Sequence, residues 1–290
     1  MSPEILYILG AGRSGSTLLE RLLGSARGVV AVGELHCLWR MPLEELTCSC
    51  GAPARACGFW RDVRRGAGLT DAALGELRAL EHASVRHRRI LGALGRLDQF
   101  HRQAGVRQFL DTQQRLFDAV ADITGAGVII DNSKAAPRGW ALSAMDNVRI
   151  VHIRRRPGEV VAAWRRVKPD PSLGGPMHRP SAAAAAATWL LTELSAARLG
   201  KRRGMVRLDY DDLVASPEAA LARIGVATDQ IPWTGPNRFL PDADYHALNG
   251  NPDRFRRGEI AIRPAPQPTL PFSDQAAVNI FGAALERVSP

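Results

Sequence analysis

The sequence is poor in lysine, in aromatic residues and in long apolar runs, and each shortage argues against a class of protein. Aromatic residues make up 6% of the chain and are not interleaved with its basic clusters, which argues against a surface that stacks nucleic-acid bases. No apolar run approaches the roughly 20 residues that a membrane-spanning helix requires. Apolar segments recur throughout and no long block of like charge is present, so intrinsic disorder is not expected.

The charge balance is basic but does not by itself identify a partner. The chain has 38 basic and 29 acidic side chains, a net charge of +9, and the lysines are only Lys134, Lys168 and Lys201. Nucleic acid, acidic metabolites and an arginine-rich composition would all account for such a balance. Since no short nucleic-acid-binding pattern is present, we expect no nucleic-acid partner. The first residues lack the basic region of a signal peptide and indicate a buried strand, so we expect a cytoplasmic protein without a membrane span.

Short apolar runs alternate with helix-length segments along the chain. Continuous apolar runs are typical of buried parallel strands, so the alternation predicts an α/β fold with a central parallel sheet flanked by helices. The predicted strands are residues 5–9, 29–32, 128–130, 148–153 and 205–208, and the predicted helices are residues 17–26, 135–144, 158–167 and 181–199, the last capped by Ser181.

One long segment interrupts this alternation between the second and third predicted strands. Residues 36–125 hold a cysteine-containing loop and then, from Leu69 to about Ile123, apolar residues at three- and four-residue steps, which predicts a helical insertion packed on the core. The tail over residues 232–271 is rich in Pro, Asn and Gly and is predicted to be mostly loop. We therefore expect a single domain over residues 1–290.

A glycine-rich loop follows the first predicted strand and opens a helix. Its sequence is Gly10-Ala11-Gly12-Arg13-Ser14-Gly15-Ser16-Thr17, which predicts unpaired backbone amides at a helix N-terminus, where phosphate groups bind. The spacing also fits the nucleotide-triphosphate loop G-x-x-x-x-G-K-[ST], but Ser16 stands where its lysine belongs, which weakens the prediction of an ATP or GTP site. An ordinary tight turn between strand and helix is the alternative.

Two further basic segments follow. Arg154, Arg155 and Arg156 lie between the end of a predicted strand and the start of a helix, and they predict a second anion site; a solvated charge cluster is the alternative. The loop from Asn249 to Gly258 supplies more arginines. Two separated basic sites suit a nucleotide that is phosphorylated at both ends.

Together these segments resemble the sulfotransferases that use 3′-phosphoadenosine 5′-phosphosulfate (PAPS) as donor. The glycine loop is similar to their 5′-phosphosulfate loop, G-x-x-R-S-G-[ST]-T-L-L, and the resemblance extends from Ile5 to about Pro264. It implies a P-loop-like three-layer fold and adenosine 3′,5′-bisphosphate as the product of the donor. The residues implied at the 5′-phosphosulfate are Gly12, Arg13, Ser14, Gly15, Ser16, Thr17 and Leu18.

The resemblance also implies residues at the 3′-phosphate. Arg155 matches the arginine that the family places two residues before a proline, whereas the family's usual serine six residues after that proline is Ala163 here, so one hydroxyl contact is missing or supplied elsewhere. Residues 245–265 are implied to cover the nucleotide, and His246 with the Gly-Asn-Pro-x-Arg string resembles bacterial members in particular. The residues implied in this loop are Arg256, Arg257 and Gly258, similar to the family's Arg-Lys-Gly segment, and Arg254 as a further candidate.

Sulfonate transfer to a hydroxyl requires a group that removes the acceptor proton and cations beside the transferring group. Glu34 follows the second predicted strand and is expected to face the crevice at the strand ends. The resemblance implies that Glu34 is the general base, with His36 as runner-up. Lys134 after the third predicted strand and Arg13 are expected to stabilise the sulfonate and the departing phosphate, with Ser133 as a further hydroxyl. The alternatives are a surface glutamate and a lysine at a helix start.

The four cysteines, Cys37, Cys48, Cys50 and Cys57, fall within 21 residues. Structural disulfides are disfavoured in a cytoplasmic protein, and the spacing lacks the paired C-x₂-C pattern of common zinc sites. Bacterial sulfotransferases show a similar Cys-x-Cys-Gly…Cys-x-Phe-Trp string. We expect free or reversibly oxidised thiols, with zinc ligation as the main alternative.

The sequence thus predicts a PAPS-dependent sulfotransferase that needs no metal for the transfer and acts on a small-molecule or glycan hydroxyl. The competing hypotheses are a small-molecule kinase or nucleotide hydrolase, and a non-catalytic binder of polyanions. The motifs do not identify the acceptor, whose pocket is expected from the helical insertion, the cysteine-containing loop and residues 168–180. The sequence leaves open whether the chain forms a homodimer.

Overall fold

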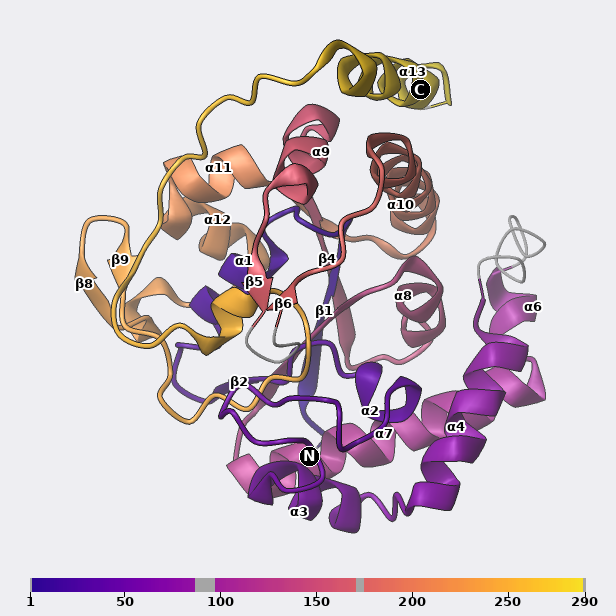
Figure 1. The fold of residues 1–290 in the computed structure, drawn as a ribbon. Helices are drawn as coiled ribbons and strands as arrows, with labels where there is room; N and C mark the ends of the chain where they lie inside the picture. Colours follow the sequence, from indigo (N-terminus) through magenta and orange to yellow (C-terminus); the bar gives the residue numbers. More distant parts are fainter. Residues whose placement is uncertain (1, 87–96, 171–174, 289–290) are drawn as a thin grey trace.

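A parallel five-stranded sheet forms the centre of the molecule (Figure 1). The computed structural model describes residues 2–86, 97–170 and 175–288. The strands lie in the order β2-β3-β1-β4-β7, and their bounds are β1 Glu4–Leu9, β2 Val29–Ala31, β3 Val128–Lys134, β4 Val148–Arg154 and β7 Val206–Asp209. All four neighbouring pairs are parallel. The predicted α/β fold with a central parallel sheet is confirmed.

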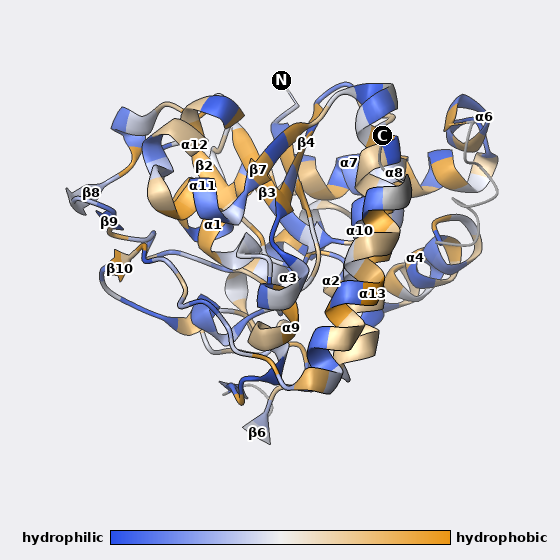
Figure 2. Cartoon of the chain, turned by 90° about the horizontal axis from the view of Figure 1, so that it is seen from above, coloured by the Kyte–Doolittle hydropathy of each residue, from blue (hydrophilic) through white to orange (hydrophobic). Residues whose placement is uncertain are grey.

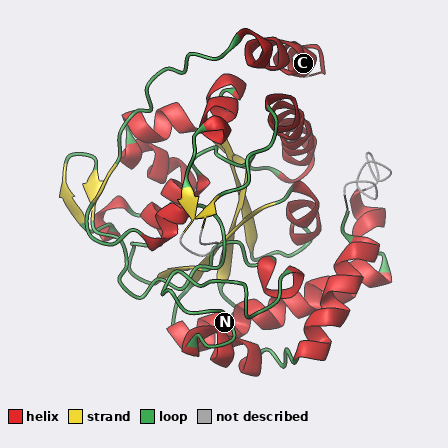
Figure 3. Ribbon diagram, in the orientation of Figure 1, coloured by secondary structure: helices red, strands yellow, loops and turns green. Residues whose placement is uncertain are grey.

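Helices cover both faces of this sheet, which explains its continuous apolar strands. In β1, Ile5, Tyr7 and Leu9 belong to one hydrophobic cluster, whereas Leu6 and Ile8 belong to another on the opposite face. The first cluster includes residues of α7 (Ala104–Thr124) and α8 (Ala136–Leu142), and the second includes residues of α1 (Ser16–Leu23), α11 (Tyr210–Ala215) and α12 (Pro217–Ile224). The result is a three-layer arrangement with the sheet in the middle (Figure 3).

A third group of helices packs at the side of the sheet. α9 (Pro157–Arg165), α10 (Ala182–Arg203) and α13 (Phe272–Val288) contact one another, and Val160, Trp189 and Leu285 form one of their shared apolar clusters. These helices carry both hydrophilic and hydrophobic residues, as expected for helices with one buried face (Figure 2). The predicted N-cap of α10 is confirmed, because the Ser181 hydroxyl accepts a hydrogen bond from the Ala184 amide at 3.2 Å.

The predicted helical insertion lies between β2 and β3. It comprises α4 (Asp71–Ser84), α6 (Leu97–His101) and α7, and the segment predicted as a cysteine-containing loop before it also contains α2 (Cys37–Arg40) and α3 (Gly58–Gly66). The periodic residues that predicted it in α7, namely Phe109, Gln113, Leu116, Phe117 and Val120, are all buried. The part of the predicted helical stretch over residues 87–96 lies outside the described residues.

Several elements differ from the sequence-based prediction. The third strand does not end at Ile130 but continues to Lys134, so Lys134 is the last residue of β3 and does not follow it. The tail is mostly loop, but it contains β8 (Trp233–Gly235), β9 (Arg238–Phe239) and β10 (Ile260–Ala261), which form a small antiparallel sheet. Helices α11, α12 and α13 and the 3₁₀ turns η1 (Thr228–Gln230) and η2 (Pro252–Phe255) were not predicted.

A short hairpin precedes α10. β5 (Pro169–Asp170) and β6 (Gly175–Pro176) pair antiparallel, with the connecting residues outside the described part. None of the described helices is both long and apolar enough to cross a membrane.

Candidate active site

A cleft of about 800 Å³ opens at the carboxyl end of the parallel strands. Its lining includes the loop after β1, Glu34 beyond β2, Lys134 at the end of β3 and Arg155 just after β4. β1 lies between β3 and β4, so the loops leaving neighbouring strands meet at this edge, where open α/β sheets bind ligands. The predicted site residues that line the cleft are Gly12, Arg13, Gly15, Ser16, Thr17, Leu18, Glu34, Lys134, Arg155 and Arg256.

The glycine-rich loop is held in a tight conformation by close contacts. Gly15 is the N-cap of α1 with φ 92°, and Arg13 also has a positive φ of 70°. A Cβ atom at Gly15 would lie 2.3 Å from the Tyr210 ring, and one at Gly12 would lie 2.7 Å from the Trp164 ring. No side chain caps α1, so its first backbone amides remain available to an anion. Ser14 is buried and does not line the cleft.

Arg13 points a partly unsatisfied guanidinium into this region. Its guanidinium carbon lies 4.7 Å from the centre of the Trp164 ring, and its Nη2 donates to the Met177 sulfur at 3.2 Å. Its buried Nε has no hydrogen-bond partner among the described residues. Burial lowers the pKa of Arg13 from its usual value, and arginine side chains in proteins stay protonated at neutral pH. A half-buried cation with a spare donor is suited to an incoming anion.

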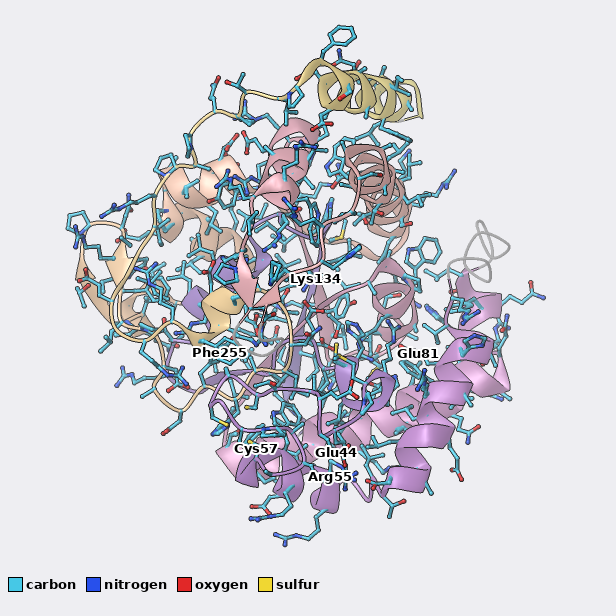
Figure 4. The ribbon with its side chains drawn as sticks, viewed as in Figure 1. Glu44, Arg55, Cys57, Glu81, Lys134 and Phe255 are labelled. Carbon is cyan, nitrogen blue, oxygen red and sulfur yellow. The ribbon has the colours of Figure 1, made fainter. Side chains whose placement is uncertain are left out.

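Glu34 and Lys134 form an ion pair inside the cleft. The Lys134 Nζ lies 2.5 Å from the Glu34 Oε1, and both side chains are about 15% exposed, at 16% and 15%. The Asn249 amide donates to the other carboxylate oxygen at 3.4 Å. Gly250, with φ 92°, lies so close that an added Cβ atom would be 3.0 Å from Glu34 Oε1. The predicted base and the predicted sulfonate-binding lysine are therefore in direct contact (Figure 4 labels Lys134).

A buried network fixes the position of Lys134. Lys134 has a positive φ of 62°, and the register between β1 and β3 shifts just before it. Asp131 on the same strand forms a fully buried ion pair with Arg138 at 2.6 Å and accepts hydrogen bonds from the amide and hydroxyl of Ser133. A strained backbone at such a place persists because its surroundings hold it. Ser133 is buried and serves this network; it does not line the cleft.

Arg155 lines the cleft just after β4, on the other side of β1 from Lys134. Its Nε donates to Glu159 at 2.9 Å, its Nη1 donates to the Arg13 carbonyl at 3.1 Å, and its guanidinium carbon lies 4.1 Å from the centre of the Tyr210 ring. These three contacts fix the guanidinium and join it to the glycine loop. Ala163 also lines the cleft, so the position of the family's serine faces the site without a hydroxyl.

The predicted nucleotide-covering loop divides into lining and supporting residues. Arg256 lines the cleft, whereas Arg254, Arg257 and Gly258 do not. Arg254 is buried and donates to the Gly250 carbonyl at 2.7 Å, with Asp170 of the β5–β6 hairpin 3.8 Å away. Arg257 donates to the Ser49 carbonyl at 2.7 Å, and Gly258 has φ 74°. A direct nucleotide role for these three residues stays a prediction.

His36 lies beside the cleft but does not line it. Its backbone amide donates to the Ser133 hydroxyl at 3.2 Å, and its Nε2 is 3.7 Å from the Cys37 sulfur. Burial, with a smaller contribution from Arg40, lowers the pKa of His36 well below its usual value, so the ring is neutral at physiological pH. Of the two candidates for the general base, only Glu34 lines the cleft in which the acceptor would bind.

The sequence analysis missed residues that build the cleft. Arg21 on α1 donates to the backbone carbonyls of Arg254 and Arg256 at 3.1 and 2.9 Å, so the helix after the glycine loop also holds the covering loop. Lys168 belongs to the predicted acceptor segment, but its ion pair with Asp253 at 2.7 Å, which joins the covering loop to the segment before β5, was not predicted. Other missed lining residues are Trp164, Tyr210, Asn249 and Arg263. The Asn-Gly-Asn-Pro string was the available signal for Asn249; the others come from ordinary helix or loop sequence.

The expected acceptor segments contribute unequally. The cysteine-containing segment provides Met41, Glu45 and Thr47, and the region of residues 168–180 provides Lys168, Asp170, Met177 and His178. Contrary to expectation, none of the described residues of α4, α6 and α7 lines the cleft. α7 packs on β3 and on α3, and α4 and α6 pack on α7, so these helices support the site from outside.

Comparisons with known proteins agree with this geometry. A family model described as the sulfotransferase family matches residues 3–234. No curated protein matches the chain. The sulfotransferase domain from the curacin biosynthetic pathway shares 14% identity over 98% of this chain and 98% of that one, with a TM-score of 0.50, which supports the fold. The sulfotransferase domain of the olefin synthase from Synechococcus PCC 7002 shares 20% identity over 98% and 95% of the two chains, with a TM-score of 0.49.

Proposed function

The chain belongs to the sulfotransferase family, and we propose that it transfers a sulfonate group from PAPS to an acceptor hydroxyl, with Glu34 as general base. The observation that carries the proposal is a single cleft lined by an uncapped helix N-terminus, a second anchored arginine and a carboxylate–lysine pair. A donor phosphorylated at both ends needs two anion sites, here the helix N-terminus and the second arginine. Transfer to a hydroxyl needs a base and a cation beside the transferring group, here the carboxylate–lysine pair.

The donor site is supported by its charges and free donors. The amides of residues 15–18 and Arg13 would hold the 5′-phosphosulfate, since the Arg13 Nε has no partner among the described residues. Arg155 and Arg256 would hold the 3′-phosphate, and Tyr210, which lines the cleft with its ring against Arg155, is a candidate for the hydroxyl that Ala163 lacks. With Ser16 in place of the P-loop lysine, a triphosphate would lack its usual cation.

The transfer step follows from the Glu34–Lys134 contact. The acceptor oxygen forms a bond to sulfur as the bond from sulfur to the bridging phosphate oxygen breaks, the acceptor proton passes to Glu34, and adenosine 3′,5′-bisphosphate leaves. Negative charge grows on the bridging oxygen and stays on the sulfonate oxygens, so Lys134 and Arg13 stabilise the transition state. Since Lys134 is bound to Glu34 before the donor arrives, the sulfonate competes with Glu34 for the lysine, and the carboxylate oxygen is free to take the acceptor proton once that bond is lost.

Thermal unfolding in the presence of nucleotides tests the proposal. Adenosine 3′,5′-bisphosphate is expected to raise the unfolding temperature strongly and ATP with magnesium to raise it little, because ligands that bind only the folded state stabilise it. The reverse order would reject a sulfotransferase and support a kinase or nucleotide hydrolase. Salt-dependent binding to DNA without stabilisation by either nucleotide would instead support a polyanion-binding protein. A screen of hydroxyl compounds with labelled PAPS then identifies the acceptor class.

A further inference from the structure

Cys48, Cys50 and Cys57 lie close to His246, which is distant from them in sequence. Cys48 and Cys50 lie on a turn in which the Cys48 amide donates to the Ala52 carbonyl and the Gly51 amide donates to the Cys48 carbonyl, both at 2.9 Å. Cys57 is the N-cap residue of α3 (Figure 4 labels it), and His246 lies 189 residues further along, just before the covering loop. One ligand atom from each of the four residues lies within 4.8 Å of every other.

Three of the six ligand-to-ligand distances match the edges of a zinc tetrahedron, and the other three are within 4.8 Å. With Zn–S bonds of about 2.3 Å and a Zn–N bond of about 2.05 Å, tetrahedral angles place two sulfurs about 3.8 Å apart and a sulfur about 3.6 Å from the nitrogen. The sulfurs of Cys50 and Cys57 are 3.8 Å apart, and the His246 Nδ1 is 3.5 Å from the Cys48 sulfur and 3.4 Å from the Cys57 sulfur. None of the four cysteines forms a disulfide.

Surrounding residues hold His246 and the backbone beside Cys48 in place independently of any ion, whereas Cys50 is exposed. The Phe59 ring stacks on the His246 ring with centroids 5.0 Å apart and planes at 8°, and the Trp60 indole donates to the His246 carbonyl at 2.8 Å. Ser49 and Ala247 pair through two hydrogen bonds of 2.9 Å. Cys48 and Cys57 are buried, so their sulfurs face His246 and not water. Such support for the ligands is typical of a built metal site.

We propose that Cys48, Cys50, Cys57 and His246 bind one zinc ion as a structural Cys₃His site. Thiolate and imidazole ligands in a tetrahedron favour zinc over hard cations such as magnesium or calcium. All four positions are supplied by the protein, so the ion has no open position for substrate and takes no part in the transfer. The spacing C-x-C-x₆-C with a distant histidine hides the site from a search for paired C-x₂-C motifs.

The ion would join the cysteine-containing loop to the covering loop beside the active site. Leu248, two residues after His246, bridges to Gly33 and to Cys48, and its carbonyl accepts the Glu34 amide at 2.8 Å. Asn249 and Gly250, which follow, contact the Glu34 carboxylate. The zinc therefore fixes the segment that positions the proposed base, while its presence does not depend on the sulfonate donor.

Metal analysis of the full-length protein, purified under reducing conditions from zinc-supplemented cells, tests the site. We expect about one zinc per chain, lost in Cys48→Ser and Cys57→Ser but kept in Cys37→Ser, whose sulfur lies outside the cluster and accepts from Asn249. A zinc chelator should lower the unfolding temperature of the wild type and not that of metal-free Cys57→Ser. Protein without stoichiometric zinc, or equal zinc loss in the Cys37 variant, would overturn the proposal.

Cobalt exchange into the wild type covers the case in which the cysteine variants fail to fold. Cobalt bound by three thiolates and one imidazole in a tetrahedron gives intense ligand-field bands in the visible and thiolate charge transfer in the near ultraviolet. We expect both signals, saturating at about one cobalt per chain. Weak octahedral absorption without charge transfer, or a Cys50–Cys57 disulfide found by mass spectrometry in the freshly reduced protein, would contradict a Cys₃His site.

Discussion

Replacing Glu34 by glutamine separates catalysis from donor binding. The amide keeps the size and hydrogen-bonding reach of the side chain, so it can still contact Lys134 and Asn249, but it cannot accept the acceptor proton. Loss of a general base typically costs about 10²–10⁴-fold in rate. That corresponds to about 3–5 kcal/mol in activation free energy, and we expect kcat to fall by that factor.

The affinity for the donor nucleotide should not fall with the rate. The Glu34 carboxylate neutralises Lys134 at 2.5 Å, so its removal leaves the lysine free to bind an anion. We therefore expect the affinity for adenosine 3′,5′-bisphosphate to stay the same or to increase in Glu34→Gln.

The assay is release of adenosine 3′,5′-bisphosphate from PAPS with an acceptor from the screen, combined with calorimetric titration of the bisphosphate. Glu44→Gln is the matched control, since this exposed carboxylate on the same segment pairs with Arg55 and does not line the cleft. A Glu34→Gln rate within tenfold of the wild type would refute Glu34 as base and direct attention to His36. A parallel fall in rate and nucleotide affinity would refute the separation of roles.

Three further predictions concern donor binding and stability. Arg155→Ala should weaken the binding of adenosine 3′,5′-bisphosphate by about 10- to 150-fold, the loss expected for a charge-assisted hydrogen bond. The binding of adenosine 5′-phosphosulfate, which lacks the 3′-phosphate, should weaken much less. Equal losses of affinity for the two ligands by calorimetric titration would contradict the assignment of Arg155 to the 3′-phosphate. Gly15→Ala should lower the free energy of unfolding by more than Gly28→Ala in chemical denaturation, since both glycines have positive φ but only Gly15 has the Tyr210 ring 2.3 Å from a Cβ; similar losses would contradict the contact. Burial raises the pKa of Glu20 from 4.5 to about 7, so the folded state binds this proton more tightly than the unfolded state does. The free energy of unfolding of the wild type, relative to that of Glu20→Gln, should therefore fall as the pH rises from about 5 to 7, by at most about 1.4 kcal/mol per pH unit. Denaturant titrations in which the difference between the two proteins does not change with pH would contradict the shift.

The parts of the fold that the sequence predicts are those with a short-range signal. Apolar runs such as Ile5–Leu9 can only be buried between two helical layers, and the glycine-rich stretch after the first of them predicts a tight loop before a helix, so both are readable from composition and spacing. Helix α13 was missed because its apolar positions matter only through contact with α9 and α10, which no local pattern records.

Most of the predicted site residues line one cleft, but the contacts between them could not be predicted from the sequence. Glu34 lies beyond the end of β2 and Lys134 is the last residue of β3, and only the pairing of these two strands, which are distant in sequence, brings Lys134 Nζ to 2.5 Å from Glu34 Oε1. The same holds for the four proposed zinc ligands, because His246 lies 189 residues from Cys57. Arg21 was missed for a similar reason, since its partners are backbone carbonyls, which carry no residue signature.

A crystal structure with adenosine 3′,5′-bisphosphate bound tests the central claim most directly. The account predicts the 5′-phosphate on the amides of residues 15–18 and Arg13, and the 3′-phosphate within hydrogen-bonding distance, about 3 Å, of the Arg155 guanidinium. It also predicts that Glu34 and Lys134 line the space next to the 5′-phosphate. A nucleotide in the reverse orientation, or one bound outside this cleft, would contradict it.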